Sequence, residues 1–182
     1  MTGITQVRLS GFGGQGVVLA GILLGEAGAI EGKHVTGSNS YGAQARGSGC
    51  KSEIVLSDAA IDFPHLTASD ILVAMSQGAY DMYCGDVKED SGLILYDQSL
   101  VSPRKDLRVK QLGVRATEVS VKKLKNKQIA NIVLLGVLIE AAKIVSPKAM
   151  QKAIALHVSE RFRALNLKAL RAGMDLGRQT LG

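Results

Sequence analysis

A glycine-rich turn is the first stretch of this chain whose residue types and spacing could do chemistry. Gly11, Gly13 and Gly16 fit the pattern G-x-G-x-x-G, between a short apolar stretch and a long apolar one. Glycine permits positive φ and lets backbone N–H groups approach a ligand closely, and a helix N-terminus adds unpaired donors. We therefore predict that Gly11, Gly13, Gly14, Gln15 and Gly16 hold an anion such as a phosphate or carboxylate.

A second donor-rich segment follows at residues 38–49. A long loop just downstream of the first strand–helix unit is more often functional than idle. The alternative is an ordinary hairpin connection or a surface used only for packing. We predict that part of this segment also contacts a cofactor, through the residues Tyr41, Gln44, Arg46, Gly47 and Ser48.

The glycine pattern alone is compatible with two further arrangements. A tight strand–helix turn can form without any ligand, and a nicotinamide dinucleotide can bind at such a turn. Dinucleotide binding requires an acidic residue at the end of the second strand, to hold the ribose. The sequence after Thr36 is Gly37-Ser38-Asn39-Ser40, which contains no carboxylate, so a dehydrogenase is disfavoured.

A serine hydrolase is the competing catalytic hypothesis. Ser76 lies in A-x-S-x-G, between a predicted buried strand and a predicted helix, where a nucleophile elbow would stand. Such an enzyme needs an acid and then a histidine downstream, and Asp97 and His157 are the candidates. His157 falls within a helical apolar pattern, which predicts a packed histidine at the edge of the core rather than a catalyst.

The elements that must position these residues alternate between strand and helix. Such alternation predicts an α/β fold, here a Rossmann-like three-layer domain with a mainly parallel sheet and helices on both faces. Ligands in such folds bind at the carboxyl ends of strands, where the glycine turn lies. The sequence predicts strands at 5–9, 33–36, 51–56, 70–75, 93–96 and 108–112, helices at 17–30 and 76–84, and a connection at 114–125.

Three helices are expected to close the chain, at residues 129–145, 146–162 and 167–176. Ser146 followed by Pro147 has the form of an N-cap with proline at the first helical position. Asn166 is the predicted cap of the last helix.

Composition places the chain among globular proteins. With 182 residues, of which 46% are hydrophobic, we expect one domain over residues 1–182 that buries its own core. The polar start predicts no signal peptide, and no apolar run is long enough to span a bilayer, so we expect a cytoplasmic protein without a membrane contact. Cys50 and Cys84 are isolated and the three histidines are scattered, which disfavours a metal or iron–sulfur site within this chain.

The net charge of +6 hides an asymmetry. Residues 1–100 carry 5 Lys and Arg against 11 Asp and Glu, whereas residues 101–182 carry 17 against 5. A basic half suggests a polyanion or an acidic partner, or simply a solvated face. Phe162 is the one aromatic residue of that half, so stacking platforms for single-stranded nucleic acid are missing and we expect no nucleic-acid partner.

Several separated motifs together resemble one family, the gamma subunits of 2-oxoacid:ferredoxin oxidoreductases, and among these the 2-oxoglutarate enzyme most. The motifs are GFGGQGV at 11–17, YGAQARGSG at 41–49, NIVLLGVL at 131–138 and NLKALRAGMDLG at 166–177. Relatives often carry ExRGG in the second motif, where this chain has Gln44 and Ser48. That difference removes any carboxylate role at this place but leaves a backbone role for the loop.

The resemblance implies an accessory subunit without catalytic residues of its own. The family's enzymes convert a 2-oxoacid, coenzyme A and oxidised ferredoxin to an acyl-CoA, carbon dioxide and reduced ferredoxin. Thiamine diphosphate and iron–sulfur clusters are expected on partner subunits. The chain would pack on the alpha subunit near the coenzyme A site, within an assembly that includes a beta subunit and in some cases a ferredoxin-like delta subunit.

Two alternatives remain beside this interpretation. The chain could be a free-standing Rossmann-like nucleotide-binding protein, or the small subunit of an indolepyruvate:ferredoxin oxidoreductase, which shares the same type of domain. Isolated from its partners, a subunit with exposed apolar surface is expected to self-associate.

Overall fold

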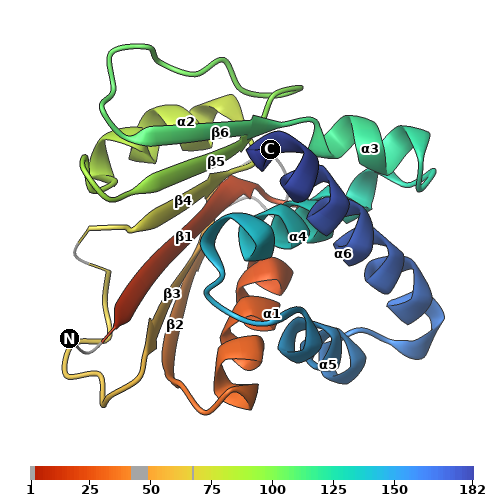
Figure 1. Cartoon of the computed structure of the whole chain (residues 1–182), viewed down its shortest axis with the longest axis horizontal. Coiled ribbons are helices and arrows are strands. Elements are labelled where there is room, and N and C mark those ends of the chain that lie inside the picture. The colour runs from red at the N-terminus through yellow and green to blue at the C-terminus, as the bar shows by residue number, and fades with distance from the viewer. Residues whose placement is uncertain (1–2, 42–48, 67) are drawn as a thin grey trace.

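The computed structural model describes residues 3–41, 49–66 and 68–182. Within these ranges the strands lie in the first two thirds of the chain, with helices between some of them, and helices alone follow (Figure 1). The elements are β1 Ile4–Phe12, α1 Val17–Ile30, β2 His34–Tyr41, β3 Gly49–Ser57, β4 Ile71–Ala74, α2 Gln77–Tyr83, η1 Cys84–Asp86, β5 Leu93–Asp97, β6 Lys110–Val114, α3 Ala116–Lys122, η2 Lys127–Ile129, α4 Ala130–Ala142, α5 Pro147–His157 and α6 Glu160–Leu181.

The sheet has six strands in the order β2-β3-β1-β4-β5-β6. Strands β1, β4, β5 and β6 pair in parallel, whereas β3 runs antiparallel to both of its neighbours, β1 and β2. The predicted α/β class with a mainly parallel sheet is therefore confirmed. The strand order departs in opposite directions on the two sides of β1, which makes the carboxyl end of β1 a topological switch point.

Side chains alternate between the two faces of the sheet. Val73 of β4 belongs to the large core beneath α1 and α4, while its neighbours Leu72 and Ala74 belong to a smaller core that includes Tyr80 of α2. Figure 1 shows α1, α4, α5 and α6 gathered on one side of the sheet. The expected three layers, with helices on both faces, are present.

Helix α1 is apolar around its whole circumference because it is packed on several sides. It contacts β3 of the sheet, α4 and α5. A Cβ added at Gly21 would lie 1.9 Å from Ser52 Oγ, so glycine is what allows the helix to approach β3 this closely.

Helices α4 and α6 also pack closely at positions where both have a glycine. A Cβ at Gly136 would lie 2.4 Å from the Leu170 carbonyl oxygen, and one at Gly173 would lie 2.0 Å from the Val133 carbonyl oxygen. The two backbones therefore touch. In Figure 1 the long α6 runs across the outside of α4, as a layer beyond the helices that cover the sheet.

The carboxyl-terminal boundaries correct the sequence-based expectation. Helix α5 ends at His157 because Val158 adopts an extended conformation, and α6 already begins at Glu160. Asn166 therefore lies inside α6 and is not its cap, and its amide nitrogen donates to the Phe162 carbonyl oxygen. The helical period continues across the break, so periodicity alone could not show where one helix stops.

Two further expectations were wrong in detail. Residues 116–122, predicted within a connection, form the short helix α3. Strand β2 continues to Tyr41, where the second donor-rich segment was expected to be loop from residue 38 onward. The predicted contacts of Gln44, Arg46, Gly47 and Ser48 fall in residues 42–48, which lie outside the described residues.

Candidate functional site

The glycine turn joins β1 to α1 and bends sharply at two residues. Gly14 has φ +95° and Gly16 has φ +73°, which are left-handed conformations that favour glycine. Gly16 is also the residue that precedes the first turn of α1. The predicted strand–turn–helix arrangement is therefore present, with the first N–H groups of α1 directed out of the turn.

Gly11 is required for a different reason. It is the buried penultimate residue of β1, and a Cβ there would lie 2.4 Å from Gln15 Oε1 and 3.0 Å from Met75 Cβ. Glycine is thus needed at position 11 because it leaves space for the Gln15 side chain, and not because the backbone there adopts a positive φ.

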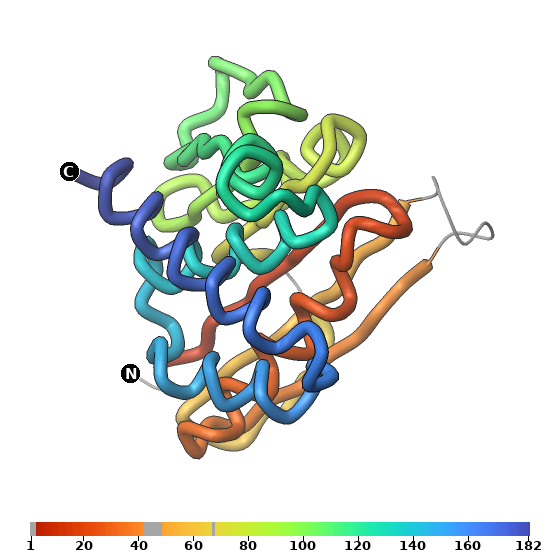
Figure 2. The backbone as a smooth tube through the Cα atoms, turned by 90° about the vertical axis from the view of Figure 1, so that its right-hand side faces the viewer, coloured from red at the N-terminus to blue at the C-terminus, as the bar shows by residue number. Residues whose placement is uncertain are grey.

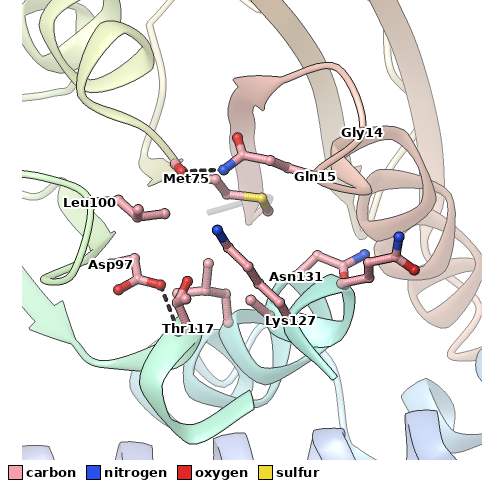
Figure 3. Close-up of a pocket in the computed structure, with 11 residues that line it drawn as sticks. Gly14, Gln15, Met75, Asp97, Leu100, Thr117, Lys127 and Asn131 are labelled. Carbon is pink, nitrogen blue, oxygen red and sulfur yellow. Dashed lines mark hydrogen bonds between the residues drawn. The ribbon is translucent and has the colours of Figure 1, made fainter. Parts of the chain in front are cut away.

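Gln15 links the ends of two neighbouring strands. Its Oε1 accepts a hydrogen bond from the Phe12 backbone N–H at 2.6 Å, and its Nε2 donates to the Met75 carbonyl oxygen at 2.7 Å (Figure 3). Both ends of the amide are engaged within the protein. Gln15 therefore holds the turn against β4, which leaves the backbone of the turn as the part that can meet a ligand.

Asn131, at the start of α4, is a site residue that sequence reasoning missed. Its Nδ2 donates to the Gly16 carbonyl oxygen at 3.0 Å, and a Cβ at Gly16 would lie 2.3 Å from that nitrogen. Its Oδ1 is buried and has no hydrogen-bond partner among the described residues. The sequence feature that could have identified Asn131 is its polar amide at the start of an otherwise apolar helix.

A pocket of about 170 Å³ lies beside the turn, at the carboxyl ends of β1, β4 and β5 (Figure 3). This is the switch point at which open α/β sheets bind their ligands. Strand ends, α3 and the start of α4 all contribute to the wall. Its lining residues are Gly14, Gln15, Met75, Asp97, Leu100, Thr117, Lys127, Gln128, Ala130, Asn131 and Leu134.

The two charged groups of this pocket differ in whether they have bonding partners within the protein. Asp97 is buried, and its carboxylate accepts backbone hydrogen bonds from Ser99 at 2.9 Å and Thr117 at 2.7 Å. Lys127 forms no ion pair within the described part of the chain, and Figure 3 shows its side chain extending into the space between Met75 and Thr117. The Lys127 amine is thus the charged group of this pocket that is available to a ligand.

A second hollow, of about 320 Å³, lies between the two sequence motifs on the other side of the turn. Phe12 pairs with Gly49 and Tyr41 pairs with Cys50, so the described ends of both motifs meet at one edge of the sheet. Figure 2 shows the turn after β1 and the ends of β2 and β3 on the same side of the molecule. We call this hollow the motif groove; it is lined by Ser10, Gly11, Phe12, Ser40, Tyr41, Gly49, Cys50, Lys51, Gly78, Ala79, Met82 and Tyr83.

A charge cluster stiffens the sheet beneath the motif groove. Arg8 of β1 is only 7% exposed and pairs with Glu53 at 2.8 Å and with Asp86 at 2.9 Å, while Lys51 reaches Glu53 at 2.9 Å. The Arg8 guanidinium also lies 4.5 Å from the Tyr83 ring centre, in a cation–π contact. Burial raises the pKa of Glu53, but the hydrogen bonds from Lys51 and Arg8 outweigh it and hold that pKa below its usual value.

The hydrolase hypothesis finds no support in this geometry. Ser76 is buried and caps α2, with its Oγ accepting from the Ala79 N–H at 3.3 Å. Asp97 and His157 line different pockets. His157 is an exposed residue whose Nε2 lies 2.9 Å from Glu26 Oε2, so the expectation of a packed core-edge histidine was also wrong.

Metal and membrane features were sought in the described residues. In these ranges no group of three or more His, Cys, Asp and Glu side chains could hold a metal ion. Both cysteines are buried free thiols. Of the helices that the structure describes, none combines the length and apolar character needed to cross a bilayer.

Comparison with known proteins gives a family. The model of the family "Pyruvate ferredoxin/flavodoxin oxidoreductase" matches residues 6–176. The 2-oxoglutarate synthase subunit KorC of Methanocaldococcus jannaschii is 42% identical over 177 residues, which cover 96% of this chain and 94% of that relative. The gamma subunit of a keto/oxoacid ferredoxin oxidoreductase from Geobacter sulfurreducens superposes with a TM-score of 0.87 at 34% identity, over 98% of both chains.

A more distant structure shares the fold within a longer chain. This is a 2-oxoglutarate:ferredoxin oxidoreductase from Magnetococcus marinus with 2-oxoglutarate, coenzyme A and succinyl-CoA bound, with a TM-score of 0.86 at 21% identity. The match covers 97% of this chain and 31% of that one. From the family match and the near-complete alignments with separate subunits, this chain belongs to the pyruvate ferredoxin/flavodoxin oxidoreductase family, as a gamma subunit of a 2-oxoacid:ferredoxin oxidoreductase.

Proposed function

We propose that the 2-oxoacid is 2-oxoglutarate and that this subunit supplies binding surface on the coenzyme A side of the enzyme rather than catalytic groups. The preference for 2-oxoglutarate over indolepyruvate rests on the KorC relatives, which are 36–42% identical to this chain. The assembled enzyme would convert 2-oxoglutarate, coenzyme A and oxidised ferredoxin to succinyl-CoA, carbon dioxide and reduced ferredoxin.

The observation that carries the coenzyme A proposal is the meeting of the two sequence motifs at the motif groove. Phe12 of the glycine turn and Tyr41 of the second motif are both exposed there, and Lys51 adds a cation at the base. Aromatic surface beside cationic and backbone donors suits a ligand that combines a planar base with phosphates. Arg46 follows Tyr41 by five residues in the sequence, in the second motif, and is the cation that the sequence predicts for this contact.

The catalytic cofactors belong, in this proposal, to other subunits. Thiamine diphosphate would lie between the alpha and beta subunits, and the iron–sulfur clusters on chains that carry cysteine motifs. The described residues fit that division. The Asp97 carboxylate already accepts two backbone hydrogen bonds, and the Ser76 hydroxyl caps α2 through Ala79. Neither side chain is therefore available as a general base or a nucleophile. The chain would instead position coenzyme A and bind the alpha subunit.

The test is the steady-state kinetics of the assembled enzyme with two substitutions in the second motif. Arg46→Ala and Tyr41→Ala are each expected to raise the Michaelis constant for coenzyme A by roughly tenfold, the size of one lost charge-assisted or stacking contact. The turnover number and the Michaelis constant for 2-oxoglutarate should stay the same, because the chemistry occurs elsewhere.

Matched controls separate this effect from a general loss of assembly. Phe63→Ala removes another exposed aromatic ring, 59% exposed against 66% for Tyr41, from the segment that precedes β4. Arg171→Ala removes an exposed cation from α6. Equal changes in the Michaelis constant for coenzyme A in the controls and in the second-motif variants, or none in either, would rule out the motif groove as the contact.

The substrate and the partners are tested by purification from the native host under anaerobic conditions. We expect this chain to bring down a thiamine-diphosphate-binding pair of subunits and a ferredoxin-like chain, in equal amounts. The purified complex should reduce ferredoxin with 2-oxoglutarate faster than with indolepyruvate. Recovery of the chain alone, with tight binding of a free nucleotide, would support the alternative of a free-standing nucleotide-binding protein.

A further inference from the structure

We propose that the pocket at the carboxyl ends of β1, β4 and β5 is a second ligand site, which binds a small carboxylate with an apolar body. This pocket shares no lining residue with the motif groove. The inference therefore goes beyond the coenzyme A proposal, and either can fail without the other.

The size of the pocket sets the size of the ligand. Its volume is about 170 Å³, and an apolar protein cavity of about 150 Å³ is known to hold benzene. A body of six or so carbon atoms with a carboxyl group at the mouth would fill it. A nucleotide or a coenzyme A molecule is far too large to enter.

The walls call for an apolar body. Met75, which follows β4, and Leu134 from α4 are buried, and half-buried Leu100 also lines the pocket. Figure 3 shows Met75 and Leu100 on neighbouring sides of the pocket. Displacing water from such surface favours the binding of an apolar group. A sugar or an inorganic ion would leave these side chains without contacts.

The charge of the site calls for one anionic group. The amine of Lys127 has no acidic partner among the described residues, and its side chain extends into the pocket (Figure 3). The Asp97 carboxylate in the opposite wall is 1% exposed and already receives two backbone N–H groups, one of them from the first turn of α3. Because this carboxylate is buried and already bonded to two donors, the exposed charge of the pocket is the Lys127 amine.

Asn131 is a buried amide in the wall of the pocket. It is 3% exposed, and its Oδ1 has no donor in the described structure, although its nitrogen is held by Gly16. Buried polar atoms are almost always satisfied, so each exception in a native protein calls for a partner. Because Asn131 lines the pocket, its side-chain amide should report on binding.

The experiment is a titration of the full chain with benzoate, followed by ¹H–¹⁵N NMR and calorimetry. Benzamide is the control ligand because it has the same shape without the charge, and acetate is the control without the apolar body. Benzoate should shift the backbone signals of Gly14 and Thr117 and the side-chain signal of Asn131. Its dissociation constant should be at least tenfold lower than that of either control ligand.

A pair of lysine variants tests the anchor. Lys127→Met keeps most of the chain length and removes the charge, and should weaken benzoate binding about tenfold while leaving the weak binding of benzamide unchanged. Lys123→Met removes an exposed lysine four residues earlier, which forms no ion pair with a described residue and does not line the pocket, and should change neither. Both positions are exposed, so both variants are expected to fold.

The proposal is overturned by any of three results. Benzoate and benzamide could bind equally well, the Lys127→Met and Lys123→Met variants could behave alike, or benzoate could shift signals at the motif groove in place of those at the pocket. Retention of benzoate binding in Arg46→Ala, together with an unchanged Michaelis constant for coenzyme A in Lys127→Met, would show that the two sites are independent.

Discussion

The side-chain amide of Asn131 donates a hydrogen bond to the carbonyl oxygen of Gly16 at 3.0 Å, across 115 residues of sequence. This contact fastens the start of α4 to the turn that opens α1. The same nitrogen occupies the space where a Cβ of residue 16 would stand. One close approach therefore explains both why residue 16 is a glycine and why an amide side chain begins an apolar helix.

Gly16→Ala should destabilise the protein by about 2–4 kcal/mol, because it adds a steric conflict to the strain of a positive φ. Gly32→Ala is the matched control, since Gly32 has φ +79° but no described atom lies within 4 Å of its added Cβ. That variant should lose only about 1 kcal/mol. Urea denaturation measures both, and equal losses would mean that Asn131 can move aside.

Gly173→Ala should also destabilise, although alanine favours an isolated helix by about 1 kcal/mol over glycine. The new methyl group would lie 2.0 Å from the Val133 carbonyl oxygen and would force α6 away from α4. Gly78→Ala in α2 is the control, because its Cβ would meet only Phe12 at an ordinary 3.7 Å. A thermal melt should show a lower midpoint for Gly173→Ala and an equal or higher one for Gly78→Ala.

Glu53→Gln should cost about 3 kcal/mol at pH 7, because it leaves the buried Arg8 without its nearer partner. The pKa of Glu53 is lowered in the folded protein, so its contribution is present above the unfolded value near 4.5 and is lost as the pH falls through the folded value. The difference in unfolding free energy between wild type and Glu53→Gln should therefore shrink below about pH 4.5.

Glu118→Gln provides the exposed comparison for that experiment. The hydrogen bond from Lys122 likewise lowers the pKa of Glu118, but this pair lies on the solvent side of α3. Its loss should change the unfolding free energy much less than the loss of Glu53 at every pH. A pH-independent difference for Glu53→Gln would show that the carboxylate charge is not what Arg8 requires.

Ser146→Ala should destabilise by about 1 kcal/mol, because its Oγ caps α5 by accepting from the Ala149 N–H at 3.2 Å. Ser159→Ala is the comparison, since Ser159 precedes α6 in the same position but its side chain makes no capping hydrogen bond within the described structure. Denaturant titration of the two variants should show a loss for the first and almost none for the second.

The sequence predicted the elements that local patterns encode. The first strand, the glycine turn, α1 and the Ser146-Pro147 start of α5 all follow from hydrophobic periodicity and from capping residues close in sequence. The antiparallel direction of β3 is not a local property. It follows from pairings with β1 and β2, and the short predicted second strand gave no sign that β2 extends to Tyr41.

The site was predictable only in part, for a similar reason. The spacing of the glycines is visible in the sequence, but the contact partners of the site residues are remote along the chain. Asn131 contacts Gly16, and Met75 contacts Gln15. Arg8 pairs with Glu53 and Asp86. In the sequence Lys127 is only one member of a basic run, with nothing to distinguish it from Lys123. Its place at a pocket depends on how α3 and α4 pack, which no spacing along the chain reveals.

The antiparallel strand β3 has a consequence for how relatives of this protein can diverge. Because β2 and β3 are hydrogen-bonded neighbours that run in opposite directions, Tyr41 and Gly49 lie at the same edge of the sheet, beside the end of β1. The chain between them can grow or shrink without shifting any strand register, at an entropic cost of only about 0.6 kcal/mol per doubling of its length. Evolution could therefore change the length of this connection by insertion and deletion, while the glycine turn stays fixed by the packing of α1 and α4.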